Sequence, residues 1–511
     1  MTWLKLSAIQ TRVFQEDIVA HFLASDHSIA VVLPTGSGKT IVAIKIADKY
    51  LSKGKVVFLG PNNELIRQHK RDIHQFMNLK QSEVQVISGI IPPIKRQKFW
   101  EEARIACATP QTMLNDMRQG RVPVDQISLI IFDEMHLAGD DYDYVDIATI
   151  AEIKKISRLG LTATPGLDHA QFDRALSRLK LSEYVIRTAE DSTVGEHLHV
   201  KYEFKHVVPL TSELRYYEFL IDIRMRGIYD ILRQYNYVYG DFKILSIKEL
   251  GAIITKARAG RDEEGNIAIN KVVLTNAAEF MKLRHLLLLL MTENYTAVYL
   301  YFEKLFTESR GKNKVKASER IINDPRLQVV RREITEKYHQ HVKHPKILRL
   351  IDLLYNALHK SQQVIVFANN RDSQTGIYRA LQACTGLSEK SAIIHSESTK
   401  TGKAKNVEAI ENFISGKIPI LISTSILEAG IHIPVVDIII NYSLPLEEST
   451  MVQRWGRVGR TKDGEVHYLA SAHSFDMNLL YATFAKKRRM LRTIKDFSLG
   501  FKPPEQLKLF A

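Results

Sequence analysis

The sequence contains very little cysteine. Only Cys107 and Cys384 occur among its 511 residues, and they stand far apart in no metal-ligand spacing. This scarcity argues against a disulfide framework or a cysteine-based zinc site, and it favours a reducing compartment. Long apolar runs are also lacking, because the leucine-rich stretch 285–291 is too short to span a bilayer and predicts a buried helix.

The opening residues, MTWLKLSAIQTRVF, lack the apolar core of a signal peptide. These absences predict a soluble intracellular protein, cytoplasmic and associated with the nucleoid, without membrane contact.

Acidic residues are outnumbered, with 57 Asp and Glu against 71 Lys and Arg, which gives a formal net charge of +14. The excess favours a polyanionic partner, nucleic acid more than a membrane surface. Charge that serves only solubility is the alternative.

The length and the apolar pattern predict two α/β domains. A chain of 511 residues is too long for one hydrophobic core. Short β-branched runs alternate with helical stretches, which is typical of a parallel sheet covered on both faces. The runs predicted as strands are 29–33, 55–59, 84–87, 128–132 and 157–161 and, after about residue 360, 363–367, 391–394, 418–422, 435–440 and 465–469.

The region between these two patterns has a different character. From about 190 to 343, apolar residues recur at helical spacing without strand alternation. Tyrosines in this region either stack on bases or, at such spacing, form the core of the helices. We therefore predict a first domain over 1–189, a mostly helical, nucleic-acid-recognising insertion over 190–343, a second domain over 344–480, and a basic helix with a tail over 481–511.

A phosphate-binding loop is predicted within VVLPTGSGKT, which stands between an apolar strand and a helical run. Gly36 and Gly38 let backbone N–H groups approach phosphate, and the N-terminus of the following helix adds positive potential. Lys39 is expected to reach the β- and γ-phosphates of a nucleotide, and Thr40 is expected to ligate Mg²⁺.

The remaining loop residues, Thr35 and Ser37, complete the predicted nucleotide-binding turn. Leu33 departs from the strict pattern G-x-x-x-x-G-K-T, because it stands where the first glycine belongs. The strand before the loop and the helix after it still favour phosphate binding over a chance match.

Two carboxylates follow a predicted strand in LIIFDEMH. Asp133 and Glu134 are placed at the carboxyl end of this strand, where ligands collect in open α/β sheets. We expect Asp133 to hold Mg²⁺ through water, and Glu134 to orient and deprotonate an attacking water. An acidic turn without chemistry is the alternative, and the phosphate loop upstream argues against it.

Arginines alternate with small residues in QRWGRVGR, residues 453–460. A γ-phosphate bound to the first domain develops charge during transfer, and Arg457 and Arg460 of the second domain have the chemistry to stabilise it. Such arginine fingers contribute about 10³–10⁵ in rate. Because the two halves of the site lie on different domains, the sequence predicts that hydrolysis is coupled to domain closure.

Taken in order, these segments resemble the motifs of superfamily 2 helicases. The match covers nearly the whole chain and implies two RecA-like parallel-sheet domains and an ATPase that depends on nucleic acid, ATP and Mg²⁺. The segments are TRVFQ (11–15), PTGSGKT (34–40), GPNNELIRQH (60–69), ATPQT (108–112), DEMH (133–136), TAT (162–164), VIVFANNRDS (364–373), ILISTSILEAGIHIP (420–434) and QRWGRVGR (453–460).

The resemblance also implies roles for single residues. Met135 and His432 depart from the helicase pattern, and His432 stands where relatives often carry an aspartate that touches the ribose. The implied roles are adenine contact for Arg12 and Gln15, nucleotide contact for Gly430, interdomain coupling for Thr162 and Thr164, γ-phosphate contact for Gln453, Arg457 and Arg460, and nucleic-acid contact for Arg67, Thr109, Gln111, Ser423 and Thr424. For Arg67 the alternative is an ordinary charge on the helix surface. For the nucleic-acid residues Thr109 and Thr424 the alternative is a helix cap.

Within the superfamily, the chain resembles the archaeal Hef and FANCM type, most clearly over 108–148, 297–306, 320–326 and 344–354. This resemblance implies the helicase portion only, without a nuclease domain, and a translocase that remodels forked and branched DNA in replication-fork repair or recombination. We expect deletion of 200–340 to spare basal ATP hydrolysis and to remove the preference for branched substrates. A double-stranded-RNA-stimulated ATPase of the RIG-I and Dicer type, or an ATP-switched nucleic-acid clamp with little hydrolysis, are the alternatives.

The last residues, EQLKLFA, resemble short peptides that dock to bacterial sliding clamps. The anchors of such a peptide would be Gln506, Leu507, Leu509 and Phe510. A frayed tail, or one that packs on the second domain, is the alternative. A sliding clamp as partner would favour DNA metabolism over RNA sensing.

Overall fold

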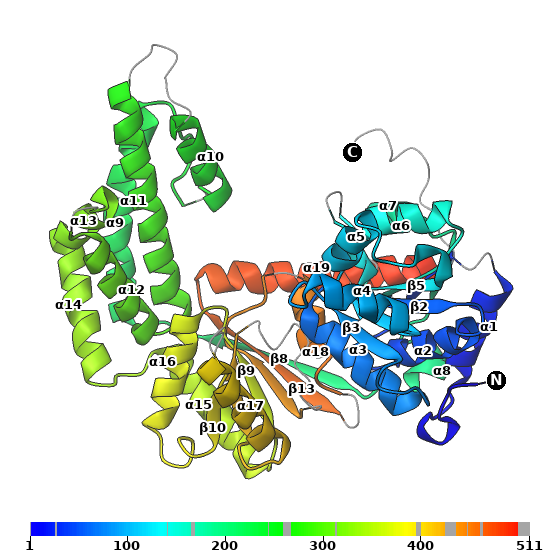
Figure 1. Cartoon of the computed structure of the whole chain (residues 1–511). Helices are drawn as coiled ribbons and strands as arrows, with labels where there is room; N and C mark the ends of the chain where they lie inside the picture. The colour runs from blue at the N-terminus through cyan, green and yellow to red at the C-terminus, as the bar shows by residue number, and fades with distance from the viewer. Residues whose placement is uncertain are drawn as a thin grey trace.

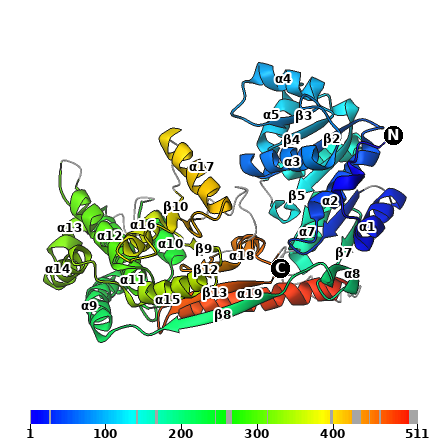
Figure 2. The same cartoon turned by 90° about the horizontal axis from the view of Figure 1, so that it is seen from below.

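The structure is a computed structural model of the whole chain, shown in Figure 1. It describes residues 2–25, 28–139, 142–164, 169–243, 245–258, 267–311, 314–394, 400–424, 436–446, 448–459 and 463–498. Figure 1 shows two α/β domains and a helical region, and the first domain also lies apart from the helical region in Figure 2. None of the helices that the structure describes has the length and apolarity needed to cross a bilayer.

The first domain is built on a parallel sheet of seven strands in the order β3-β4-β2-β5-β6-β1-β7. Helices cover both of its faces, and a separate apolar core lies on each side. The strands are β1 (Ser28–Val32), β2 (Lys55–Leu59), β3 (Val84–Ile87), β4 (Ile105–Ala108), β5 (Ile127–Asp133), β6 (Ser157–Thr162) and β7 (Glu183–Ile186). The helices are α1 (Val13–Ala24), α2 (Lys39–Tyr50), α3 (Asn63–Phe76), α4 (Pro93–Glu102), α5 (Pro110–Arg118), α6 (Tyr144–Ile153), α7 (His169–Arg178) and the single turn α8 (Ser192–Gly195).

The second domain is built on a parallel sheet of six strands in the order β10-β11-β9-β12-β13-β8. This sheet also has an apolar core on each face. Its strands are β8 (Lys201–Val208), β9 (Val364–Phe367), β10 (Ser391–Ile393), β11 (Ile420–Ser423), β12 (Ile438–Asn441) and β13 (Gly464–Ser471). Its helices are α15 (Pro345–His359), α16 (Arg371–Gln382), α17 (Lys400–Ile414), α18 (Glu448–Trp455) and α19 (Phe475–Ser498).

The helical region has one apolar core of its own, which includes the leucine-rich stretch expected to be buried. It comprises α9 (Ser212–Gln234), α10 (Ile247–Arg258), α11 (Ile267–Thr292), α12 (Tyr295–Glu308), α13 (Lys316–Asn323) and α14 (Pro325–His339). The predicted fold class, two parallel-sheet α/β domains separated by a mostly helical region, is confirmed.

Strand β8 lies inside the range that we expected to be helical. It pairs in parallel with β13 over Lys201–Val208 and closes one edge of the second sheet. Exposed apolar residues lie on both faces of this edge strand, Tyr202 and Phe204 on one and Val207 on the other, because successive side chains alternate across a strand. Deletion of 200–340 would therefore remove a strand of the second sheet, so it cannot serve as a test of the helical region alone.

Helix α19 joins the two α/β domains (Figure 2). Near its start, Leu480 belongs to the core of the second domain. At its other end, Phe497 is buried in the core of the first domain, with its ring centroid 4.8 Å from that of Phe172 and 5.5 Å from that of Tyr184. The residues that we predicted as a basic helix thus form part of the helix that connects the two α/β domains.

Candidate active site

The phosphate loop connects β1 to α2, as the sequence predicts. Gly36 and Gly38 have φ angles of 88° and 93°, in the left-handed region that favours glycine. A Cβ atom at Gly38 would lie 2.5 Å from Nε2 of Gln15, so a side chain here would also clash. Leu33, which replaces the first glycine of the strict pattern, is fully buried in the core, where it packs instead of lining the loop. The loop therefore keeps its turn without that glycine.

Two residues from the start of the chain support this loop. Nη1 of Arg12 and Nε2 of Gln15 both donate to the carbonyl of Ser37, at 3.1 and 3.0 Å. Gln15 is 2% exposed, and its Oε1 is buried without a hydrogen-bond partner within the part of the chain that the structure describes. An unpaired carbonyl oxygen in this place fits a donor such as the amino group of adenine.

Asp133 and Glu134 lie at the carboxyl end of β5. The phosphate loop follows β1 at the same end of this parallel sheet. Glu134 has a φ of 52° and a ψ of 49°, a strained conformation for a residue with a side chain. Its backbone N–H donates to Oδ1 of Asp133 at 3.0 Å, and the hydroxyl of Tyr144 donates to the Asp133 carbonyl at 2.7 Å. These contacts hold both carboxylates in one place.

A buried histidine, His69, lies beside Asp133. Its Nε2 atom is 3.0 Å from Oδ2 of Asp133, and its side chain is only 5% exposed. Burial alone would raise the pKa of Asp133, but the contact with His69 and the charge of Lys39 outweigh burial and lower it. Asp133 is therefore held as a carboxylate, the form that binds a cation.

The environment of Glu134 has the opposite effect. Burial and the negative charge of Asp133 raise the pKa of Glu134 to about 7, against the opposing charges of Lys39 and His69. A carboxylate with a raised pKa accepts a proton more readily than an exposed one. Two adjacent carboxylates with pKa values moved in opposite directions suit two roles, one as a cation ligand and one as a base.

The residues predicted to couple the domains form a short polar chain beside Glu134. Nδ1 of His136 lies 3.4 Å from the Glu134 carboxylate and 3.0 Å from the hydroxyl of Thr162. That hydroxyl donates to the carbonyl of Thr164 at 2.7 Å. Burial lowers the pKa of His136 to about 4, so its ring is neutral near pH 7. Met135 is buried against Gly160, which agrees with a packing role for this departure from the helicase pattern.

Sequence reasoning missed His69, His136 and Tyr144 as members of this site. His69 and His136 are the last residues of the helicase motifs GPNNELIRQH and DEMH, so their place in these motifs was a signal that they belong to the site. The contact of Tyr144 with Asp133 spans eleven residues and a turn, and the sequence carried no signal for it.

The arginine motif begins in α18 and ends in a turn beside the edge of the second sheet. The Arg457 carbonyl accepts from the backbone N–H of Val436 at 3.0 Å. Gly459 has a φ of 69°, in the left-handed region, and a Cβ atom there would lie 3.0 Å from Cγ of Lys201, so both the backbone and the space favour glycine. Within the motif, Arg454 is 2% exposed and lies in the protein interior. The side chain of Gln453 and the residues Arg460, Gly430 and His432 lie outside the described part of the structure.

The predicted nucleic-acid residues of the first domain have mixed surroundings. Arg67 is half-exposed and forms an ion pair with Glu64 at 2.7 Å, so the helix-surface alternative stays open. Thr109 precedes α5, and its hydroxyl lies 2.8 Å from that of Thr112. Gln111 is exposed on the first turn of the same helix. Their contact with nucleic acid stays a prediction.

Ser423 and Thr424 lie at the carboxyl end of β11 in the second domain, and both are buried. The Ser423 hydroxyl donates to the Thr424 carbonyl at 2.9 Å.

The predicted sliding-clamp anchors Gln506, Leu507, Leu509 and Phe510 lie outside the described residues. Across the described ranges, no group of three or more His, Cys, Asp or Glu residues is arranged to hold a metal ion.

Known families match both α/β domains. Residues 4–167 match the family described as type III restriction enzyme, res subunit, and residues 345–462 match the helicase conserved C-terminal domain. The crystal structure of the Pyrococcus furiosus Hef helicase domain matches with a TM-score of 0.70 and 28% identity, over 94% of this chain and all of that one.

Two similar proteins are named as helicases of different nucleic acids, one of RNA and one of DNA. A putative ATP-dependent RNA helicase of Methanocaldococcus jannaschii is 30% identical over 96% of this chain. The ATP-dependent DNA helicase MPH1 of Pyricularia oryzae is 27% identical over 90% of it. The chain spans 62% of the first relative and 43% of the second, so both have further sequence beyond the shared region.

Proposed function

Because this chain belongs to the superfamily 2 helicases of the Hef and FANCM type, we propose that it hydrolyses ATP when stimulated by nucleic acid and uses the energy to remodel forked or branched DNA. One observation carries the proposal. Asp133 and Glu134 are held with opposite pKa shifts beside Lys39 in one domain, and Arg457 lies on the other. An ATP site divided in this way links hydrolysis to domain movement.

The residues of the first domain are suited to bind the nucleotide. The backbone N–H groups from Gly36 to Lys39 would hold the phosphates at the start of α2, and the Lys39 ammonium would pair with the β- and γ-phosphates. Thr40 and Asp133 have the oxygen donors that Mg²⁺ prefers, and bound Mg²⁺ would neutralise charge on the β- and γ-oxygens.

Glu134 and the arginines act on the reacting atoms. Glu134 takes a proton from water as the water oxygen bonds to the γ-phosphorus, and the bond between that phosphorus and the β–γ bridging oxygen breaks. ADP and inorganic phosphate leave, and the proton passes from Glu134 to solvent. Arg457 and Arg460 stabilise the charge that develops on the γ-phosphoryl group.

His69 positions Asp133 in this scheme. We expect His69→Leu to weaken Mg²⁺ activation of ATP hydrolysis by about 10- to 100-fold, because partners that orient a metal ligand have effects of this size. His69→Gln is the matched control, since its amide retains a donor near the place of Nε2. A titration of hydrolysis rate against Mg²⁺ concentration measures the effect. Equal Mg²⁺ requirements for wild type and His69→Leu would contradict the role.

The helical region is proposed to recognise the branch. In both views α10 lies nearer the first domain than α14 does (Figures 1 and 2). Lys248 and Lys256 are exposed on α10, whereas Arg332 is exposed on α14. Lysines on α10 are therefore placed to contact phosphates of a strand that also reaches the first domain.

Replacing Lys248 and Lys256 together by alanine is expected to weaken fork binding. Each lost phosphate contact reduces the slope of log K against log salt concentration by about one, so the double variant should lose about two. Binding of a labelled fork at several salt concentrations measures this slope. Arg332→Ala is the control and should keep the wild-type slope, and the same loss in the control would reject a specific role for α10.

A double-stranded-RNA-stimulated ATPase is the second candidate. The name of the M. jannaschii relative, a putative RNA helicase, favours keeping this candidate. An ATP-switched clamp with little hydrolysis fits less well, because a switch has no need of a strained, partly buried carboxylate with a raised pKa such as Glu134. Measured ATP turnover that nucleic acid stimulates and Lys39→Ala abolishes would exclude the clamp.

A further inference from the structure

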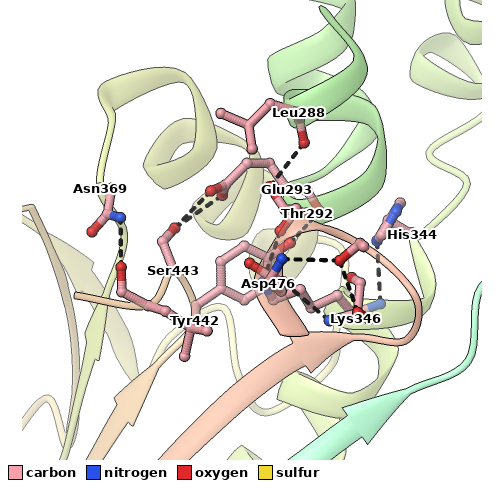
Figure 3. Close-up of polar contacts among 12 residues, drawn as sticks. Leu288, Thr292, Glu293, His344, Lys346, Asn369, Tyr442, Ser443 and Asp476 are labelled. Carbon is pink, nitrogen blue, oxygen red and sulfur yellow. Dashed lines mark hydrogen bonds and ion pairs between the residues drawn. The ribbon is translucent and has the colours of Figure 1, made fainter. Parts of the chain in front are cut away.

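The turn between α11 and α12 of the helical region is buried against the second domain. It contains Glu293 and Asn294, which are 6% and 3% exposed. The turn lies beside Tyr442 and Ser443, which follow β12 directly (Figure 3). A charged residue is placed in such a site only when its partners there are fixed.

Several hydrogen bonds hold this turn in place. The Ser443 hydroxyl lies 2.9 and 3.0 Å from the two carboxylate oxygens of Glu293, to which it donates. The Tyr442 hydroxyl donates to the Glu293 carbonyl at 2.6 Å. The Lys346 ammonium donates to the Thr292 carbonyl at 2.7 Å (Figure 3). The helical region is therefore fixed to the second domain by buried polar contacts.

Ser443 also contacts Arg454, which lies on α18. Its carbonyl accepts from Nη1 of Arg454 at 3.2 Å. Arg454 also donates to Oδ1 of Asn441 at 2.8 Å and to Oδ1 of Asn369 at 3.2 Å, and its guanidinium lies 4.6 Å from the ring centroid of Phe367. A guanidinium enclosed in this way anchors α18 and is not placed to reach a nucleotide.

Arg454 sets the position of the following turn. The backbone N–H of Arg457 donates to the Arg454 carbonyl at 3.1 Å, so the two arginines belong to one rigid segment. Ser443 thus touches the helical region through its side chain and the segment that carries Arg457 through its carbonyl. Glu293 and Ser443 are 150 residues apart in the sequence.

We propose that Glu293 and Ser443 are positioning residues that transmit the placement of the helical region to Arg457. The inference rests on the proposed function, in which Arg457 stabilises the γ-phosphoryl group. Nucleic acid held by the helical region then favours the arrangement of α18 that is competent for hydrolysis. Neither residue is placed to contact the nucleotide itself, so their loss should lower kcat by misplacing Arg457, without altering affinity for ADP.

The test uses four variants of the full chain. Ser443→Ala and Glu293→Leu remove the shared hydrogen bond, whereas Glu293→Gln keeps an oxygen acceptor for the hydroxyl. Arg379→Ala is a matched control, because Arg379 also joins the second domain to the helical region. It donates to the Tyr338 carbonyl at 3.0 Å and lies over the Tyr338 ring, and these contacts do not involve α18. For each variant, kcat and KM for ATP are measured with saturating fork DNA.

Binding of ADP alone and of ADP with aluminium fluoride is measured as well, because the fluoride complex mimics the γ-phosphoryl group in transfer. We expect Ser443→Ala and Glu293→Leu to lower kcat about tenfold and to weaken the fluoride complex about tenfold, since small misplacements of catalytic groups have effects of this order. Their ADP affinity should stay unchanged. Glu293→Gln and Arg379→Ala should stay within about twofold of wild type.

Three results would overturn the inference. They are wild-type kcat in both Ser443→Ala and Glu293→Leu, the same loss in Arg379→Ala, or a parallel loss of ADP affinity that indicates local unfolding. The proposed function fails in a different way, namely if Arg457→Ala keeps the wild-type rate. The two failures are therefore distinguishable in one set of measurements.

Discussion

Arg457→Ala is expected to lower kcat for ATP hydrolysis by about 10³- to 10⁵-fold, the range found when an arginine finger is removed. The side chain belongs to the segment anchored by Arg454, on a domain separate from the phosphate loop. On the proposed function, its charge is expected to reach the γ-phosphate only when the domains close. Affinity for ADP, which lacks that phosphate, should not change. Single-turnover hydrolysis with saturating nucleic acid measures the effect.

Arg488→Ala is the control for a general loss of positive charge. Arg488 is exposed on α19 and stands outside the motif in the sequence, so this variant should hydrolyse ATP at the wild-type rate. A loss of less than tenfold in Arg457→Ala would contradict the finger role and leave Arg460 as the remaining candidate. An equal loss in both variants would indicate a charge effect on nucleic-acid binding instead.

Glu134→Gln is expected to lower kcat by about 10²- to 10⁴-fold, as is usual when a general base is removed. Glutamine has the same shape and can keep the strained backbone of this position, so the site should stay folded. Its neutral side chain also removes the repulsion of Asp133. The variant should therefore bind ATP at least as tightly as wild type and hold it without hydrolysis.

Equilibrium binding of ATP and a single-turnover rate, measured on the same preparation, separate these two effects. Glu64→Gln is the control, because Glu64 is a half-exposed carboxylate that pairs with Arg67 on the helix surface. Near-wild-type turnover in Glu134→Gln would show that another group activates the water. A loss of ATP binding in parallel with turnover would show that the substitution damages the loop.

Much of the fold was predictable from the sequence because buried parallel strands are short apolar runs. Ten of the strands in the structure overlap runs that we predicted. Strand β4 was missed because IACA has one β-branched residue, and β7 because EYVI is half-buried. Strand β8 was missed because charged and aromatic residues alternate along an edge strand, and its partner β13 lies some 260 residues later in the chain.

The candidate site was predictable to the extent that its residues stand in contiguous motifs. The phosphate loop, Asp133 and Glu134 occupy the positions expected for them, at the carboxyl ends of β1 and β5, which β6 separates in the sheet. The opposite pKa shifts of the two carboxylates were not predictable, because burial and the contact with His69 set them.

The roles of Arg454 and Ser443 required the three-dimensional structure. Arg454 stands in the same motif as Arg457, yet its guanidinium is enclosed by groups from β12 and from the loop after β9. Spacing alone cannot distinguish an arginine that faces a ligand from one that anchors a helix. The contact of Ser443 with Glu293 likewise depends on how the helical region packs on the second sheet.

The measurement that tests the central claim most directly is steady-state ATP hydrolysis with a panel of nucleic acids. The activators are single-stranded DNA, linear duplex DNA, a fork, a four-way junction and duplex RNA, all at one stated salt concentration, with Lys39→Ala as the blank. We predict the strongest stimulation by the fork or the junction. Strongest stimulation by duplex RNA would contradict branched-DNA remodelling, and turnover that no nucleic acid stimulates would contradict a nucleic-acid motor altogether.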